Sequence, residues 1–160
     1  MAITKGRIFS INNSERKGTT KKTVKKARLI EDFGLENDAH GGSGVKQVSL
    51  LAIESIRKQS ECPKAKKKGV SLAPGDFAEN ITTEGVDLTQ LKIGDRLKIG
   101  TVTILEISKI GKECHKYCAI YYKIGDCIMP REGIFAKVLK SGEISIGDGI
   151  EVIENAKRTK

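Results

Sequence analysis

Short apolar segments separated by glycine-containing turns recur along the whole chain, and this pattern limits the possible folds more than any other feature. Within the segments, apolar and polar residues alternate, as in strands with one buried face. A Gly-Asp pair occurs four times, at 75–76, 94–95, 125–126 and 147–148. Glycine permits the turn backbone and Asp accepts hydrogen bonds from nearby amides, so we interpret these pairs as turns that lead into strands. The pattern predicts a mainly β fold, either a β-barrel or a curled sheet with a few short helices.

The expected elements follow from the spacing of the apolar residues. From Leu50 onward the apolar residues recur about every 3.6 residues instead of every second residue. This spacing predicts a helix over 50–59 with Ser49 as its N-cap. Segments 95–99 and 101–107 are expected to form a hairpin around Gly100. Segment 134–139 is compatible with strand or helix, 86–91 with a short helical turn or an irregular crossing, and 141–143 with a turn. Further strands are expected at 7–11, 23–30, 44–49, 77–83 and 150–153.

The chain is strongly basic, with a formal net charge of +9. Much of the excess lies in two runs, 17–26 and 64–68, which we interpret as solvated segments. A basic balance favours anionic partners such as a phosphorylated small molecule, a nucleic acid or an anionic membrane. Aromatic residues make up only 4% of the chain, and single-stranded nucleic acids are usually bound on aromatic platforms, so specific nucleic-acid binding is not expected.

Length and local composition predict a single intracellular domain over 1–160. The 160 residues match one ordinary domain, and 155–160 form a polar tail that is expected to be frayed. No apolar run approaches the roughly 20 residues that a membrane span needs, and the N-terminus lacks the apolar core of a signal peptide. We therefore expect a cytoplasmic protein whose cysteines are mostly reduced thiols and which does not insert into a membrane.

Three of the four cysteines, Cys114, Cys118 and Cys127, lie within 14 residues. Lys112, His115 and Lys116 surround the first two, and neighbouring cations favour the thiolate, which is the reactive and metal-binding form of cysteine. Such a thiolate can attack sulfur, carry a persulfide or bind a soft transition metal.

Other interpretations of the cysteines remain open. Each cysteine can be a small buried apolar residue, an interpretation that fits the isolated Cys62 best. A structural zinc site can use Cys114, Cys118 and Cys127 with His115 or His40, although no Cys-x-x-Cys pair is present. A redox disulfide between Cys114 and Cys118 is a third possibility.

The order of motifs along the chain is more specific than any single motif. It resembles the MOSC domain family, which forms the C-terminal module of molybdenum cofactor sulfurases and also occurs alone in bacteria. The resemblance covers nearly the whole chain. The motifs are Ile11-Asn12-x-Ser14-x-x-Lys17-Gly18, Gly34-Leu35-Glu36-x-Asp38-Ala39-His40-Gly41-Gly42, Gln47-Val48-Ser49-Leu50-Leu51-x-x-Glu54, Gly75-Asp76-Phe77-x-Glu79-Asn80-Ile81-Thr82-Thr83-Glu84-Gly85, Gly94-Asp95, the cysteine segment 111–120, and 133–138.

The resemblance implies a MOSC-type β-barrel with a cleft that holds the molybdenum cofactor (molybdopterin). It also implies that Cys114 or Cys118 serves as sulfur carrier or molybdenum ligand, with Cys127 a weaker candidate. Family members named for sulfuration receive sulfur from a cysteine desulfurase domain that uses pyridoxal phosphate. This chain has no room for that domain, so a desulfurase, like a molybdoenzyme acceptor, would be a separate partner.

The candidate cofactor-binding residues combine cations, glycine-turn amides and polar side chains, which suit a phosphorylated ligand. Several have a simpler interpretation as a solvated lysine, a turn-stabilising histidine or side chains that hold loop amides. The candidates are Lys17, Gly18, His40, Gly41, Gly42, Glu79, Asn80, Thr82, Thr83, Lys112 and Arg131.

The sequence leaves open whether the chain is an enzyme. We expect a molybdenum cofactor-binding sulfur carrier, which would make it sulfurtransferase-like or a molybdoenzyme component. The alternatives are a molybdenum-dependent reductase of N-hydroxylated compounds, a binding module stabilised by zinc, and a protein that binds nucleic acid through charge alone.

Overall fold

The computed structural model describes residues 5–13, 22–38, 42, 44, 46–60, 73–75, 77, 79–110 and 133–153. Within these ranges it is mainly β, with one α-helix and one 3₁₀-helix, η1 (Leu88–Gln90). The strands and helix are β1 (Lys5–Asn13), β2 (Lys22–Val24), β3 (Lys26–Ile30), β4 (Gly34–Leu35), β5 (Val48–Ala52), α1 (Ile53–Ser60), β6 (Ile81–Glu84), β7 (Arg96–Ile99), β8 (Thr103–Ile110), β9 (Ile134–Lys140), β10 (Gly142–Ser145) and β11 (Gly149–Ile153).

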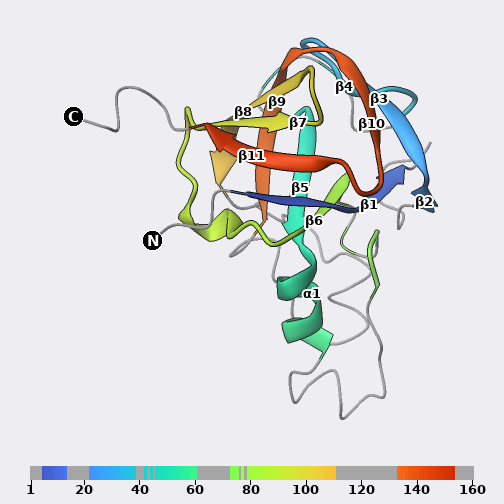
Figure 1. Cartoon of the computed structure of the whole chain (residues 1–160), viewed down its shortest axis with the longest axis vertical. Coiled ribbons are helices and arrows are strands. Elements are labelled where there is room, and N and C mark those ends of the chain that lie inside the picture. The colour runs from blue at the N-terminus through green and yellow to red at the C-terminus, as the bar shows by residue number, and fades with distance from the viewer. Residues whose placement is uncertain are drawn as a thin grey trace.

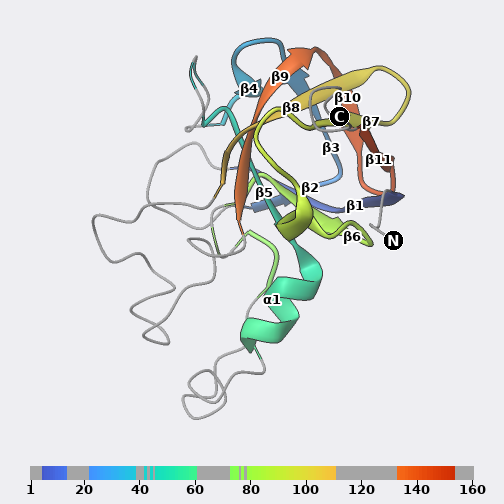
Figure 2. The same cartoon turned by 90° about the vertical axis from the view of Figure 1, so that its left-hand side faces the viewer.

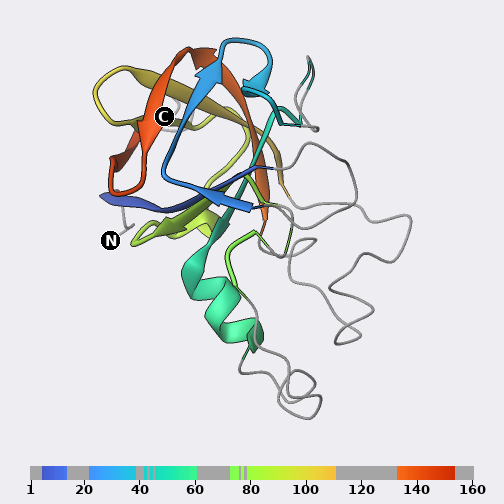
Figure 3. The same cartoon turned by 90° about the vertical axis from the view of Figure 1, so that its right-hand side faces the viewer.

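Seven strands form a closed β-barrel. Their order is β11-β7-β8-β9-β5-β6-β1, and a pairing between β11 and β1 closes the ring. β5 and β6 are parallel, whereas the other neighbouring pairs of the ring are antiparallel. β2 extends the sheet from the end of β1, and a second sheet, β10-β3-β4, lies on the side of the barrel opposite α1 (Figures 1, 2 and 3). This confirms the predicted mainly β, barrel-like fold.

The barrel interior is filled by apolar side chains from alternate strand positions, as the period of two requires. On β5, for example, Val48, Leu50 and Ala52 belong to the main apolar core, together with Ile81 of β6 and Ile134 of β9. Five other buried apolar side chains lie outside that core. They are Leu51, Ile53, Ile56, Phe77 and Phe135, on the outer side of the barrel wall and in the segments that cover it.

The expected helix over 50–59 begins too early. Leu50–Ala52 belong to β5, where all five residues are buried, and α1 begins at Ile53. A strand that is covered on both faces has a continuous apolar run instead of an alternating one. When such a run is followed directly by an amphipathic helix, the sequence pattern does not show where the strand ends and the helix begins. Ser49 lies inside β5 and does not cap a helix.

Other boundaries also differ from the expectation. The hairpin around Gly100 is confirmed, 134–140 is strand, and 88–90 is a helical turn. The expected strand over 23–30 is two strands with a bend at Lys25, and 142–145 is strand instead of turn. Only glycine fits at position 142 of this strand, because a Cβ added there would lie 2.2 Å from the Thr103 hydroxyl oxygen. The described residues include no helix long and apolar enough to span a bilayer.

Candidate functional site

One side of the barrel is buried on its outer face as well as its inner face. We call this region the covered wall and define it by the outward-facing residues Ser10 and Asn12 of β1, Thr82 of β6, Ser49 and Leu51 of β5, and Phe135 of β9. None of these residues is more than 6% exposed. α1 packs against β5 and β6 beside this region. Outward polar side chains of a barrel normally meet water, so polar groups that are buried here need protein or ligand partners.

Asn12 is the centre of the hydrogen-bond network on the covered wall. Its Oδ1 accepts hydrogen bonds from the hydroxyls of Ser10, at 2.7 Å, and Thr23, at 3.1 Å. Its Nδ2 donates to the Glu79 carbonyl oxygen at 3.1 Å and to the Thr82 hydroxyl oxygen at 3.0 Å. The amide thus uses both donors and both acceptor positions, and it joins β1 and β2 to the segment that precedes β6.

Glu79 is completely buried, and its two carboxyl oxygens differ in their contacts. Oε2 accepts hydrogen bonds from the Gly75 amide at 3.0 Å and from the Thr82 hydroxyl at 2.8 Å. Oε1 has no hydrogen-bond partner among the described residues. Burial raises the pKa of the Glu79 carboxyl above its ordinary value of 4.5, while hydrogen bonding from the Gly75 amide, the Thr82 hydroxyl and the backbone amides of Glu79 and Phe77 acts in the opposite direction.

Asn80, the residue before β6, forms hydrogen bonds to both neighbouring strands, and its side-chain nitrogen has no partner among the described residues. Its Oδ1 accepts from the Ser49 amide at 3.0 Å and from the Ser49 hydroxyl at 3.2 Å, and its own carbonyl oxygen accepts from the Asn12 amide at 2.7 Å. Its Nδ2 is buried and finds no acceptor in the part of the chain that the structure describes. Neighbouring residues 79 and 80 therefore provide one unpaired acceptor and one unpaired donor.

Three other predicted site residues are described. Thr82 lies on the covered wall and bridges Asn12 and Glu79. Thr83 lies on the inner face of the barrel, opposite Ile8 and Ala52, and its buried hydroxyl has no partner within the described ranges. The Gly42 amide donates to the Phe33 carbonyl oxygen at 2.7 Å, so this amide is already paired.

The remaining predicted residues lie outside the described residues. These are Lys17, Gly18, His40, Gly41, Lys112, Cys114, Cys118, Cys127 and Arg131, as well as Cys62 and His115. Within the described ranges, no group of three or more His, Cys, Asp or Glu side chains is arranged to hold a metal ion.

A continuous row of paired residues connects the start of the cysteine segment to the covered wall. Ile110, the last residue of β8, is paired with Ile134, which is paired with Leu50. Leu50 is paired with Ile81, and Ile81 with Ile11. Segment 111–132 follows Ile110 directly, and Asn12 and Asn80 are the neighbours of Ile11 and Ile81. The end of β8 at Ile110 therefore lies on the same row of paired residues as Ile11 and Ile81, the neighbours of Asn12 and Asn80 in the hydrogen-bond network.

Sequence reasoning assigned no site role to Asn12 or Ser10, and it assigned Ser49 only as the N-cap of a helix. The alternation of β1 does indicate that Ser10 and Asn12 share a face opposite Ile11, but a polar face on a strand ordinarily faces water. The sequence does show polar residues at 79, 80, 82 and 83, and in the structure Glu79 and Thr82 are hydrogen-bond partners of Asn12 on that face.

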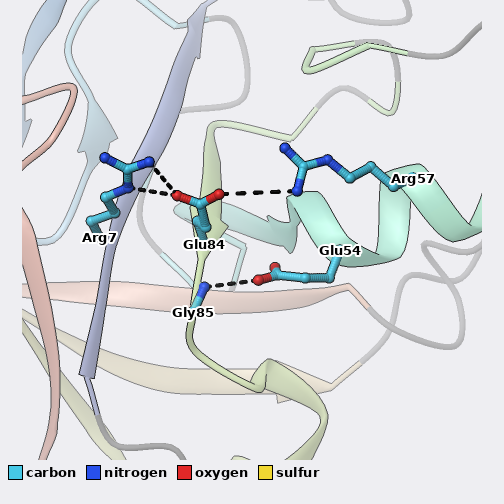
Figure 4. Close-up of polar contacts among 5 residues, drawn as sticks. All are labelled: Arg7, Glu54, Arg57, Glu84 and Gly85. Atoms are coloured by element: carbon cyan, nitrogen blue, oxygen red, sulfur yellow. Dashed lines mark hydrogen bonds and ion pairs between the residues drawn. The ribbon is translucent and has the colours of Figure 1, made fainter.

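The other end of β6 has a different set of charged contacts. Glu84 lies between Arg7, which donates to one of its oxygens, and Arg57 of α1, at 4.0 Å from the other (Figure 4). Glu54 of α1 accepts a hydrogen bond from the Gly85 amide at 2.9 Å. These contacts attach α1 to the barrel, and both arginine side chains are more than half exposed.

Comparisons with known proteins agree with this fold. The family model described as MOSC domain matches residues 37–151. The YuaD protein of Bacillus subtilis has a TM-score of 0.70 at 20% identity, over 94% of this chain and 96% of that chain. YiiM of Geobacillus stearothermophilus has a TM-score of 0.68 at 21% identity, over 93% and 75%. YiiM of Escherichia coli has a TM-score of 0.64 at 20% identity, over 92% and 70%. A search of curated proteins finds no match. At these identities the solved structures show a shared fold alone.

Proposed function

The chain belongs to the MOSC domain family, and on this premise we propose that it binds the molybdenum cofactor and carries sulfur for it on a cysteine. Family membership indicates a role related to the molybdenum cofactor. The finer proposal, a sulfur carrier in cofactor sulfuration or delivery, comes from the cysteine segment that begins one residue after β8.

The free groups of Glu79 and Asn80 carry the proposal. A buried polar group without a partner costs roughly 1–3 kcal/mol, and native proteins contain few of them. Among the described residues, an acceptor, Glu79 Oε1, and a donor, Asn80 Nδ2, lack partners on two adjacent residues that hydrogen-bond to the covered wall. Molybdopterin has amino and ring N–H donors and a carbonyl acceptor on its pterin edge. The chemistry of the two free groups therefore fits this ligand.

Each side chain has a defined part in the proposed site. Glu79 Oε1 accepts from an N–H of the pterin, and Asn80 Nδ2 donates to one of its acceptors. Thr82 and the Gly75 amide hold the other Glu79 oxygen and so position the carboxyl group. The cofactor, when bound, supplies the metal centre that accepts sulfur. Gly42, Thr83 and the candidate residues outside the described ranges stay predictions.

The sulfur step is proposed for Cys114 or Cys118. The thiolate takes the terminal sulfur of a donor persulfide and the donor leaves as its thiol, as in ordinary exchange at sulfur. A cysteine desulfurase that uses pyridoxal phosphate is the proposed donor. The row of paired residues that runs from the network to Ile110 supports this assignment. Cys114 is the fourth residue after Ile110, and four residues of chain span at most about 14 Å, so Cys114 stays within that distance of the end of the row.

The test is to purify the full chain anaerobically from cells that make the cofactor and to measure pterin, molybdenum and zinc per chain. We expect pterin with molybdenum in the parent protein. We also expect a cysteine that gains the mass of one sulfur atom after treatment with a persulfide donor, and this gain should disappear in either Cys114→Ser or Cys118→Ser. A parent protein that contains neither pterin nor molybdenum would contradict the proposal. Zinc that is lost in both variants would identify a structural metal site instead.

Glu79→Gln and Glu84→Gln form a matched pair for the same assay. Both variants remove one carboxylate at an end of β6, but only Glu79 is proposed to contact the cofactor. We expect pterin content to fall at least fivefold in Glu79→Gln and to stay unchanged in Glu84→Gln. Equal retention in both variants would remove Glu79 from the site.

A further inference from the structure

The Gln47 side chain joins three segments that are far apart in the sequence. Its Oε1 accepts a hydrogen bond from the Val138 amide of β9 at 3.0 Å. Its Nε2 donates to Asp32 Oδ1 at 2.8 Å and to the Gly44 carbonyl oxygen at 3.1 Å. Gln47 is 1% exposed, and both N–H donors of its amide are used. A buried amide that is paired in this way fixes the three segments relative to one another.

The glutamine side chain takes the place of a strand residue at the end of β5. β5 begins at Val48, which is paired with Ala136 of β9, so Val138 lies beyond the last pair of these two strands. There the Val138 amide donates to the Gln47 side chain instead of to a backbone carbonyl of β5. The Val138 carbonyl oxygen accepts from the Asp32 amide at 3.0 Å. Gln47 and the turn at Asp32 therefore complete the hydrogen bonds of β9 together.

The turn before β4 is shaped to fit against Gln47. Asp32 has a φ of 54°, in the left-handed region that few residues other than glycine adopt, and its contacts with Gln47 and Val138 hold it there. Gly34 has a φ of 118°, and a Cβ added to it would lie 2.2 Å from the Gln47 carbonyl oxygen. The turn and the residue at position 47 therefore cannot move independently.

The same contacts hold the segment that runs from β4 to Gln47. The Gly42 amide donates to the Phe33 carbonyl oxygen at 2.7 Å, and the Gly44 carbonyl oxygen accepts from Gln47 Nε2 at 3.1 Å. The segment is thus attached to the turn at Gly42 and to the Gln47 amide at Gly44. His40 and Gly42, two of the predicted cofactor-binding residues, belong to this segment in the sequence. Gln47 therefore decides where the second of these attachments lies.

We propose that Gln47 is a positioning residue, which holds the backbone at 42–44 in the arrangement that cofactor binding requires. Ser49 of the covered wall follows Gln47 by two residues, and its amide donates to Asn80 Oδ1 at 3.0 Å. The segment and the wall are therefore held by neighbouring residues of one strand. Gln47 is buried by its own protein partners and acts only through Gly44. The choice of the molybdenum cofactor as the ligand rests on the proposed function, but the positioning can be measured without it.

Two variants separate positioning from simple stabilisation. Gln47→Glu keeps an oxygen for the Val138 amide but removes both N–H donors and places a carboxylate against Asp32. Adding Asp32→Asn returns a donor to the contact between positions 32 and 47, and asparagine tolerates the left-handed backbone there. Nothing returns a donor to the Gly44 carbonyl oxygen. The double variant therefore repairs the turn and leaves the segment at Gly44 without its attachment.

Three quantities are measured on the full chain at neutral pH: the unfolding midpoint, the NMR order parameter of the Gly44 amide, and pterin per chain. We expect Gln47→Glu to lower all three. The double variant should regain the midpoint alone, with pterin content about fivefold below that of the parent protein. The control is Gln90→Glu, the same change at an exposed position of η1, which should leave all three unchanged. Pterin content that returns together with the midpoint would show a merely structural role and overturn the inference.

The Gly44 order parameter separates this inference from the function it extends. If the parent protein never contains pterin, and the order parameter still falls in the double variant, positioning by Gln47 is supported and the cofactor role is contradicted. If the parent and the double variant contain equal pterin, the cofactor role stands and the positioning role is overturned. A Gly44 order parameter that is unchanged in Gln47→Glu would overturn the positioning role with or without pterin.

Discussion

A glutamate lies at each end of β6, but the two glutamates have opposite surroundings. At the start, Glu79 and Asn80 are 0% and 1% exposed, and they contact only neutral groups among the described residues. At the end, the Glu84 side chain is 26% exposed and lies between two arginines (Figure 4). A carboxyl group at the first position is costly to ionise, whereas the second is stabilised by cations and water together. Burial, more than residue type, decides what each carboxyl group does.

This difference separates the candidate site from the contacts that attach α1 to the barrel. Exposed ion pairs contribute about 0–1 kcal/mol to stability, and salt screens them. The ion pairs of Glu84 with Arg7 and Arg57 therefore help to attach α1 but contribute little to the free energy of unfolding. Buried polar networks are strong when every member is paired and costly when one is not. One oxygen of Glu79 and the side-chain amide nitrogen of Asn80 lack partners among the described residues, so this network is the less completely paired of the two.

The largest effect is expected for Asn12→Ala. It removes four hydrogen bonds and leaves the Glu79 carbonyl and the Thr82 hydroxyl without their donor. We expect a loss of about 3 kcal/mol in the free energy of unfolding, measured by urea denaturation. Asn13→Ala is the control, because the buried Asn13 Oδ1 has no described partner, and it should cost less than about 1 kcal/mol. Equal losses would mean that the network does not stabilise this end of β6.

The next expected effect is a pH dependence that Glu79→Gln removes. The folded protein holds the Glu79 proton more tightly than the unfolded chain, because burial raises the pKa of this carboxyl above 4.5. Its contribution is fully present below pH 4.5 and is lost as pH rises through the higher pKa of the folded state. Relative to the parent, Glu79→Gln should therefore gain stability as pH increases from 4 to 8. Parallel pH curves for the parent and Glu79→Gln would refute the assignment.

A smaller effect is expected where α1 meets the barrel. Glu54→Gln weakens the hydrogen bond to the Gly85 amide from a charged to a neutral one. We expect a loss of about 1 kcal/mol in unfolding free energy and faster hydrogen exchange at the Gly85 amide. Faster exchange at Asn80 in this variant would mean that the two ends of β6 are coupled, and would weaken the contrast between them.

The smallest effect is expected for Glu84→Gln. Both arginines are more than half exposed, and their ion pairs with Glu84 are screened by solvent. The unfolding free energy should fall by about 0.5 kcal/mol at low salt, and the difference should shrink as salt increases. A loss above 2 kcal/mol that persists in high salt would mean that the attachment of α1 matters as much as the buried network.

Much of the fold was predictable because its signals are local. The hairpin around Gly100 and the strand at 150–153 follow from alternation and turn chemistry, and both are present. The start of α1 was not predictable, because Leu50–Ala52 are buried on both faces and so have no alternation. The segment 79–83 was identified as a candidate site, but its partner Asn12 was not, since 67 residues separate Asn12 from Glu79.

The sequence by itself determined the mainly β fold class, the hairpin around Gly100 and the MOSC family, because periodicity, glycine positions and motif order can be read along one chain. Only the tertiary structure decided which polar residues are buried. β1, β5 and β6 become neighbours through pairings between residues 8–11, 50–52 and 81–83. These pairings place Glu79 and Asn80 inside a buried network while leaving Glu84 partly exposed. Solvent exposure depends on what lies across the sheet, and no local pattern contains that information.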